Sequence, residues 1–436
     1  MTSLKIRSIK YNFFMNLLLT GSSVIFPLIT FPLVSRALYS DMYGLCNWAF
    51  SIVSWLSLIA MLGVNRYGIR EVAKNRDNEK KLRHITEEIF FFTLITTLII
   101  LFCFIASIFF IDSFAQHRSL FLLCSVSILC NTLGVGWFFQ GIEQYTYITI
   151  RGVIIKIICF LGVIAFVHAP DDYLIYAALI VLSAAGANLI NFFYMIHVLY
   201  KHVSNDHKNV YVASILKRLA YHKFSVVRKH AKPLLTFFII AAAISIYTVL
   251  DTVMLGFLSS DQQVGYYSAA MNVKSALVGV VSALSGVLLP RASNMLQKKL
   301  FQEYTSIIKK CIALVLCISI PLSVLLAICA TPLLNWYAGA DFASAGPVLS
   351  IVAIAIIPIG LSVIFCDAIM VPNGLERYCT FIYIFAALID FIGNLVLIPM
   401  LGATGAAIST LTVEVLIMIL EFIFIRKIIW PSQKSH

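Results

Sequence analysis

Residues 89–111 read IFFFTLITTLIILFCFIASIFFI, a stretch without a single charged side chain. At 1.5 Å per residue, a helix of this length crosses the roughly 30 Å hydrocarbon core of a bilayer. Backbone N–H and C=O groups in lipid must be satisfied within the segment itself, so the stretch is expected to be helical. It therefore predicts that the chain is a membrane protein.

Eleven more apolar spans accompany this one. They lie near 13–34, 45–63, 119–139, 152–168, 173–199, 233–257, 265–289, 307–330, 346–371, 379–400 and 404–425. Hydrophobic residues make up 61% of the 436 residues and charged residues only 12%, about half the share that is usual in a soluble domain. The sequence predicts an all-α polytopic membrane protein with about 12 transmembrane helices.

The 32 Lys and Arg residues lie almost wholly on one side of these spans. If the N-terminus is cytoplasmic, 28 of the 32 fall in cytoplasmic segments. Only Arg36 and Arg118 fall on the other side, and Lys156 and Lys274 lie within spans. This bias orients membrane helices, and a soluble protein has no reason to show it. We expect an inner-membrane-type protein with its N- and C-termini in the cytoplasm.

The net charge of +12 and the ten cysteines exclude several kinds of site. The charge is dispersed over seven cytoplasmic segments. This favours a role in setting membrane topology and in attracting anionic lipid headgroups over the binding of nucleic acid. The cysteines lie in or at the edges of spans without the spacing of a metal motif, so we expect neither disulfides nor zinc. We expect no cofactor.

The longest gap between spans divides the chain into two halves of six spans. We expect an N-terminal lobe over residues 1–200, a cytoplasmic basic linker over 201–232 and a C-terminal lobe over 233–436. The linker carries eight basic residues and four irregularly spaced histidines, among them His230. A solvated linker lying along the membrane is therefore favoured over a metal site.

Short sequences recur at corresponding places in the two halves. Residues 141–145 (GIEQY) follow the fourth span, and residues 374–378 (GLERY) follow the tenth. Residues 40–44 (SDMYG) precede the second span, and residues 261–265 (DQQVG) precede the eighth. This recurrence indicates duplication. Six spans per half give parallel repeats, which are typical of transporters whose two bundles surround a central cavity and rock to alternate access.

Asp251 and Lys274 are the first candidate functional residues. An ionisable group at mid-helix costs roughly 2.5–3.5 kcal/mol on insertion scales, so each needs a reason. The two residues lie on successive antiparallel spans at similar depth. They are either a buried structural pair, or residues of the cavity in which Lys274 binds an anion.

Asp390 and Glu414 lie near mid-membrane in the last two spans, and Asp367 lies nearer the cytoplasmic boundary. Burial disfavours a charged carboxylate, so such a group can carry a proton through a transport cycle. The alternative is a neutral carboxyl that is hydrogen-bonded to a neighbour such as Asn394 or Thr410. We treat Asp390, Glu414 and Asp367 as candidates for coupling transport to protons.

Further basic residues are candidates for binding an anionic substrate. Lys156 stands one turn inside the fifth span, where its amine can reach back to the interface. The planar guanidinium of arginine matches phosphate oxygens, although most such arginines set topology. The arginines in question are Arg36, Arg66, Arg151 and Arg291.

Several segments together resemble the polysaccharide-transport family of Wzx-type O-antigen or oligosaccharide-lipid flippases, which is part of the multidrug/oligosaccharidyl-lipid/polysaccharide exporter superfamily. The resemblance covers nearly the whole chain. It is carried by residues 36–44, 63–71 (GVNRYGIRE), 137–143 (WFFQGIE), 251–256, 265–270 (GYYSAA) and 399–407.

This resemblance implies a function. Such proteins move undecaprenyl-diphosphate-linked oligosaccharide repeat units across the bacterial inner membrane for O-antigen or capsule assembly. It also implies a cationic central cavity, coupling to protons or to the membrane potential, and membrane lipids and the polysaccharide polymerase machinery as partners.

Two other classes of function are weighed against this one. A cation-coupled, MATE-like multidrug exporter shares the topology and would have a cavity dominated by carboxylates such as Asp251. A membrane enzyme needs a sizeable outer loop, yet the longest outer loop, 331–345, contains one carboxylate, Asp341. No catalytic motif is evident, so we expect a transporter and no enzyme.

Overall fold

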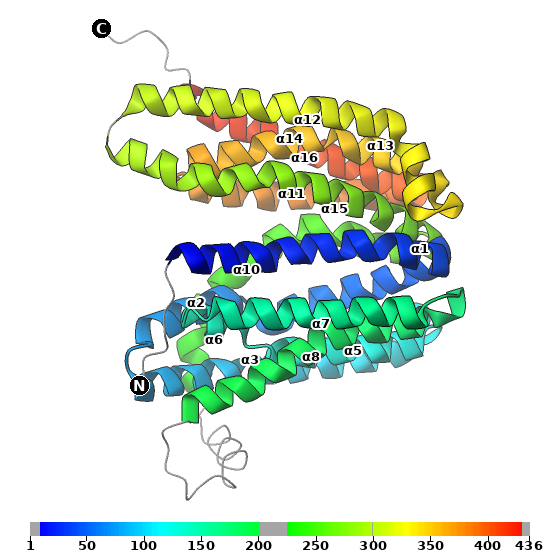
Figure 1. Ribbon diagram of the computed structural model, residues 1–436, viewed down its shortest axis with the longest axis horizontal. Coiled ribbons are helices and arrows are strands. Elements are labelled where there is room, and N and C mark those ends of the chain that lie inside the picture. The colour runs from blue at the N-terminus through cyan, green and yellow to red at the C-terminus, as the bar shows by residue number, and fades with distance from the viewer. Residues whose placement is uncertain (1–8, 201–224, 299, 430–436) are drawn as a thin grey trace, which may run out of the picture. The chain divides into compact units, whose positions relative to one another are not determined.

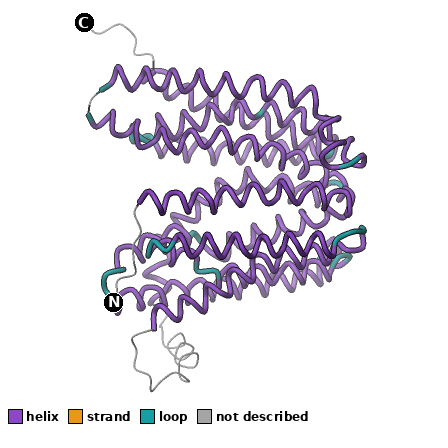
Figure 2. The backbone as a smooth tube through the Cα atoms, viewed as in Figure 1, coloured by secondary structure: helices purple, strands orange, loops and turns teal. Residues whose placement is uncertain are grey.

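A computed structural model describes residues 9–200, 225–298 and 300–429. In this part of the chain the regular structure is helical throughout, with short connecting loops and no strand (Figure 2). Each of the twelve apolar spans coincides with a helix or a run of helices. The prediction of an all-α polytopic membrane protein is confirmed.

The chain forms two compact units. The first comprises Met1–Phe26 and Ala49–Ala242, and the second comprises Pro27–Trp48 and Ala243–His436. We call them unit 1 and unit 2. The division into lobes over 1–200 and 233–436 stays a prediction.

Unit 1 is built from α2 to α8, together with parts of α1 and α10. The bounds are α1 Ile9–Met61, α2 Val64–Asn75, α3 Glu79–Phe110, α4 Asp112–Ala115, α5 Arg118–Leu133, α6 Gly136–Gly141, α7 Tyr145–Phe166, η1 Pro170–Asp172, α8 Tyr173–Tyr200 and α10 Ser225–Leu258. The long helices α3, α5, α7 and α8 run side by side (Figure 1).

Together with the other parts of α1 and α10, unit 2 is built from the remaining helices. Their bounds are α11 Asp261–Gln297, α12 Phe301–Ala338, η3 Ala340–Ala345, α13 Gly346–Ile354, α14 Ile356–Val363, the π-helical η4 Ile364–Met370, α15 Glu376–Leu401 and α16 Ala403–Ile429. Among the described residues, nine helical segments are long and apolar enough to cross a membrane. One of them is α1, which contains the first two predicted spans, so the protein is a multi-pass membrane protein.

The outer segment that was expected between the first two spans is only a kink in α1. Tyr39 has φ 54° and ψ 179°, and the residues on both sides of it are helical. The backbone N–H of Ser40 donates to Asp341 Oδ2 at 2.6 Å. Arg36 Nη2 donates to the carbonyl oxygen of Trp336 at 2.7 Å, near the end of α12. These bonds attach the kink to α12 and η3 within unit 2.

The repeated sequences 40–44 and 261–265 pack against each other within unit 2. A Cβ added to Gly44 would lie 1.8 Å from the carbonyl oxygen of Asp261. A Cβ added to Gly265 would lie 2.1 Å from the carbonyl oxygen of Ser40. Each glycine thus allows the backbone of the other segment to approach, in the reciprocal manner that a duplicated, pseudo-symmetric contact requires.

The core of unit 1 holds two of the segments that carry the family resemblance. Trp137 of α6 is 2% exposed and lies against α2, where a Cβ on Gly68 would be 2.5 Å from its ring. A Cβ on Gly141 would be 2.5 Å from Val72. These glycines let α2 and α6 pack closely.

The basic linker that was expected over 201–232 ends earlier than its sequence suggested. Residues 201–224 lie outside the described residues, whereas 225–232 form the first turns of α10. His230 is fully buried rather than solvated. Its ring nitrogens contact Tyr67 Oη at 2.6 Å and Glu88 Oε2 at 3.0 Å, which anchors the start of α10 to α2 and α3.

Candidate functional site

A buried group of polar side chains lies where α10, α11, α15 and α16 of unit 2 meet. Spacings of four or seven residues place Tyr267 with Lys274, Asp390 with Asn394, and Thr410 with Glu414 on one face of their helices, and Ser409 is adjacent to Thr410. We call this group the polar cluster: Asp251, Tyr267, Lys274, Asp390, Asn394, Ser409, Thr410 and Glu414. The structure brings together four of the predicted site residues here, namely Asp251, Lys274, Asp390 and Glu414.

Asp251 is the centre of the hydrogen-bonding in this cluster. Its Oδ2 accepts bonds from Tyr267 Oη and from Thr410 Oγ1, the latter at 2.8 Å. Its Oδ1 accepts a bond from Asn394 Nδ2 at 2.7 Å. An ionised carboxylate only accepts hydrogen bonds, so three donors converging on a side chain that is 2% exposed suit the charged form of Asp251.

Asp390 lies beside this carboxylate. Ser409 Oγ donates to Asp390 Oδ1 at 2.8 Å, and the side chain of Asp390 also interacts with that of Asp251. Among the described residues no donor reaches Asp390 Oδ2, although the side chain is only 1% exposed. Two adjacent buried carboxyls cannot both ionise cheaply, because like charges repel at low dielectric. The geometry therefore suits one shared proton.

Lys274 is the one cation among the members of the cluster. Its side chain is 6% exposed and interacts electrostatically with Glu414, and less strongly with Asp251 and Asp390. Within the described residues Lys274 makes no direct salt bridge with a carboxylate. A simple neutralising pair of Asp251 and Lys274 is therefore not the arrangement that the structure has.

The other predicted site residues are not among the described members of the polar cluster. Asp367 is half-buried in the π-helical segment Ile364–Met370. Arg36 is exposed at the kink of α1, where its guanidinium donates to the carbonyl of Trp336. Arg66 is exposed on α2. Arg291 lies in α11, and its side chain is outside the described residues.

Lys156 lies deeper in its helix than its position in the apolar span suggested. Helix α7 begins at Tyr145, so Lys156 is eleven residues, or about 16 Å, from its start, rather than one turn. Lys156 Nζ donates to Ser22 Oγ and Ser23 Oγ, both at 2.9 Å. Five residues earlier in α7, Arg151 Nη1 donates to the carbonyl of Ala187 at 2.5 Å.

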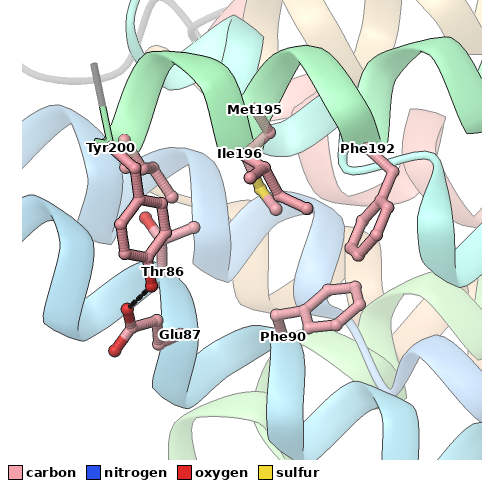
Figure 3. A pocket seen from close by; sticks show the side chains of 8 residues that line it. Thr86, Glu87, Phe90, Phe192, Met195, Ile196 and Tyr200 are labelled. Carbon is pink, nitrogen blue, oxygen red and sulfur yellow. Dashed lines mark hydrogen bonds between the residues drawn. The ribbon is translucent and has the colours of Figure 1, made fainter. Parts of the chain in front are cut away.

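A hollow between α3 and α8 is too small for an organic ligand (Figure 3). It holds about 30 Å³, which is room for a water molecule or two. The Phe90 and Phe192 rings on its walls are 5.3 Å apart, and Tyr200 donates a hydrogen bond to Glu87 (Figure 3). Within the described part of the chain, no group of three or more His, Cys, Asp or Glu residues could hold a metal ion.

The sequence did not single out Tyr267, which binds Asp251. Its seven-residue distance from Lys274 on one apolar helix was the available signal, because that spacing places both on one face. Asn394 and Thr410 were considered as partners for Asp390 and Glu414. In the structure both donate to Asp251 instead.

Comparison with known proteins places the chain among polysaccharide transporters. Two curated relatives are each named "Putative O-antigen transporter". The one from Escherichia coli (strain K12) is 23% identical over 406 residues, which are 93% of this chain and 94% of that protein. The one from Shigella dysenteriae is 26% identical over 410 residues, which are 94% of this chain and 98% of that protein.

Solved structures share the fold. The lipid II flippase MurJ in an inward closed conformation gives a TM-score of 0.70 at 15% identity, covering 95% of this chain and 87% of that one. An inward-facing multidrug resistance MATE family transporter of the MOP superfamily gives 0.65 at 12% identity, covering 97% and 99%. At these identities the likeness shows the fold alone.

The family described as "Polysaccharide biosynthesis protein" matches residues 9–296. This match confirms the resemblance to polysaccharide transporters that the sequence segments carry. Since it spans well over half of the 436 residues, the chain belongs to the polysaccharide biosynthesis protein family.

Proposed function

We propose that this protein is a flippase that moves undecaprenyl-diphosphate-linked oligosaccharide repeat units across the bacterial inner membrane by alternating access, for O-antigen or capsule assembly. The observation that carries the proposal is family membership combined with similarity to two putative O-antigen transporters over more than nine-tenths of the chain. The N- and C-termini lie in the cytoplasm, as the distribution of basic residues favours.

The physical task explains why such a chain needs polar groups inside apolar helices. A diphosphate and its sugars would leave polar groups unsatisfied in hydrocarbon, at a cost of several kcal/mol each. Lys274 and Lys156 lie well inside predicted spans, and we assign them to the substrate phosphates. Arg36, Arg66, Arg151 and Arg291 are further candidates for this role.

We assign proton coupling to the carboxyls of the polar cluster. Asp251 is held by three donors, while Asp390 lies beside it with one oxygen that no described donor reaches. If that oxygen of Asp390 carried a proton, it could itself donate a hydrogen bond to the carboxylate of Asp251. Loss of the proton would place two like charges side by side, which costs free energy and favours another arrangement of α10, α15 and α16. Glu414 and Asp367 are further candidates.

Complementation tests this proposal. In a strain whose own O-antigen flippase gene is deleted, the full chain together with its native repeat-unit pathway should restore surface polysaccharide. The same cells should show unchanged susceptibility to cationic drugs. Restored polysaccharide with unchanged drug susceptibility supports the flippase. Drug resistance without polysaccharide would support a multidrug exporter, the alternative that three carboxyls around one lysine keep open.

A further inference from the structure

An apolar groove of about 420 Å³ lies between the first part of α1 and α7, wholly within unit 1. Its walls include Leu18 and Ile25 of α1 and Ile150 and Ile154 of α7, which are all exposed side chains. A volume in the range of 300–1,000 Å³ is typical of ligand pockets. The groove is thus large enough for a ligand, and its walls select an apolar one.

Two polar bridges fix the spacing of the helices that form this groove. Thr149 Oγ1 donates to the carbonyl of Met15 at 2.9 Å, and Lys156 Nζ donates to Ser22 Oγ at 2.9 Å. Both helices advance seven residues between the bridges, so α1 and α7 run parallel over about 10 Å. Gly152 lies between the bridges, and a Cβ there would come within 3.3 Å of Leu19. The two helices that form the groove are therefore held at a fixed axial alignment.

A cation stands at the edge of the groove. Ser22 lines the groove, and it also accepts a hydrogen bond from Lys156. The other partner of Lys156 is the hydroxyl of Ser23, so both partners are neutral. Among the described residues no carboxylate forms a salt bridge with Lys156. An ammonium group about 16 Å along a membrane-spanning helix is expensive without a counter-charge, so the position of Lys156 favours binding of an anion.

Hydrocarbon walls beside a cation match an amphiphile that has a phosphate-containing head and one chain. We propose that the α1–α7 groove binds the proximal isoprene units of a polyprenyl phosphate, with the phosphate against Lys156. This inference rests on the proposed function, because it identifies where that function's lipid carrier is held. One groove fits one chain, whereas a membrane phospholipid brings two acyl chains and a glycerol.

Binding of undecaprenyl phosphate to the purified full-length protein in detergent, followed by native mass spectrometry, tests the proposal. Ile154→Trp fills the groove, and Lys156→Ala removes the cation. Each should weaken binding at least tenfold, whereas Lys156→Arg should stay within about threefold of the wild type. Ile164→Trp is the matched control, because Ile164 has a similar exposure on α7 (47% against 50% for Ile154) but does not line the groove. The control should bind as the wild type does.

Several results would overturn the inference. Wild-type affinity in a properly folded Ile154→Trp protein, judged by its size-exclusion profile, would mean that the chain binds elsewhere. Equal weakening by Ile164→Trp would mean that any bulky change on α7 acts indirectly. Displacement of undecaprenyl phosphate by an equal concentration of phosphatidylglycerol would mean that the groove is a general site for anionic phospholipids.

A complementation arm separates this inference from the proposed function. If the wild-type chain restores surface polysaccharide and Ile154→Trp does so equally well with unchanged lipid binding, the groove proposal fails and the flippase stands. If the wild-type chain restores none, the proposed function fails. The lipid-binding comparison of Ile154→Trp with Ile164→Trp still decides the groove.

Discussion

Replacing Asp251 separates its charge from its role as a hydrogen-bond acceptor. In Asp251→Asn the remaining oxygen can accept from Tyr267 and Thr410, while the new amide N–H faces the amide of Asn394. Asn394 Oδ1 has no hydrogen-bond partner among the described residues. A rotation of the Asn394 side-chain amide that exchanges its oxygen and nitrogen therefore gives the new N–H of residue 251 an acceptor. In Asp251→Ala no acceptor remains, and Asn394 Nδ2 loses its bond to residue 251.

The expected costs follow from these contacts. A hydrogen bond to a charged group contributes about 1.5–3 kcal/mol and a neutral one about 0.5–1.5, so three weakened bonds cost Asp251→Asn roughly 3 kcal/mol. Asp251→Ala loses all three, which is about twice that loss or more. The loss of stability in Asp251→Ala is reduced at Thr410, because its hydroxyl can still donate to the carbonyl of Ala406 at 2.9 Å.

Thermal unfolding of the purified protein in detergent measures the difference. We expect the order wild type, Asp251→Asn, Asp251→Ala from the most to the least stable. Thr412→Ala is the control, since Thr412 is exposed on the same helix as Thr410 and bonds only the carbonyl of Ile408 in its own helix. If Asp251→Asn unfolded at the same temperature as Asp251→Ala, the reasoning from the rotated amide would be refuted.

Three further changes test other parts of the structure. Lys274→Ala should cut surface polysaccharide more severely than Asp251→Ala does, while Lys274→Arg should retain more output; equal output from wild type, Lys274→Ala and Asp251→Ala would remove both residues from the site. His230→Ala removes a buried hydrogen-bond partner of Glu88, which costs about 1–3 kcal/mol. It should make the start of α10 more sensitive to limited proteolysis, and unchanged cleavage would contradict the anchoring role. Gly265→Ala places a Cβ 2.1 Å from the carbonyl of Ser40, so it should reduce the amount of folded protein in the membrane, as quantified by fluorescence-detected size exclusion.

The parts of the fold that depend on composition alone could be predicted from the sequence. Apolar length decides which segments can cross a bilayer, and each predicted span coincides with a helix. Helix ends were less accurate, because polar residues can continue a helix beyond the membrane. Helix α7 begins at Tyr145 rather than near 152, so Lys156 lies about two turns farther from the helix start than expected. Helix α10 begins at Ser225, inside the expected linker.

The pairing of polar side chains could be predicted only in part. Periodicity places Asp390 and Asn394 on one face of α15, but it does not say which neighbouring helix that face meets. Asn394 therefore looked like a partner for a carboxyl on its own or the next helix, whereas it donates to Asp251 of α10. His230 was misjudged for a similar reason, since its partners Tyr67 and Glu88 are more than a hundred residues away in sequence.

Two of the segments that carry the family resemblance, 63–71 and 137–143, serve packing, whereas 251–256 and 265–270 contribute Asp251 and Tyr267 to the polar cluster. Trp137 lies against Gly68, and Gly141 against Val72, so the two most recognisable motifs of unit 1 form one contact between α2 and α6. Close backbone approach tolerates few residue types, which makes such contacts easy to recognise in a sequence. The resemblance therefore predicted the scaffold well, while the site had to be located from the charges.

The three hydrogen bonds that Asp251 accepts from neighbouring side chains favour a flippase over an exporter of cationic drugs. A carboxylate that captures a drug must offer free acceptor sites to it, yet Asp251 already accepts from three side chains and is 2% exposed. Asp390 is equally enclosed and faces Asp251 rather than an open surface. By contrast, Lys156 has only neutral partners beside an open apolar groove. The charge at the edge of the α1–α7 groove is thus positive, as an anionic lipid carrier requires.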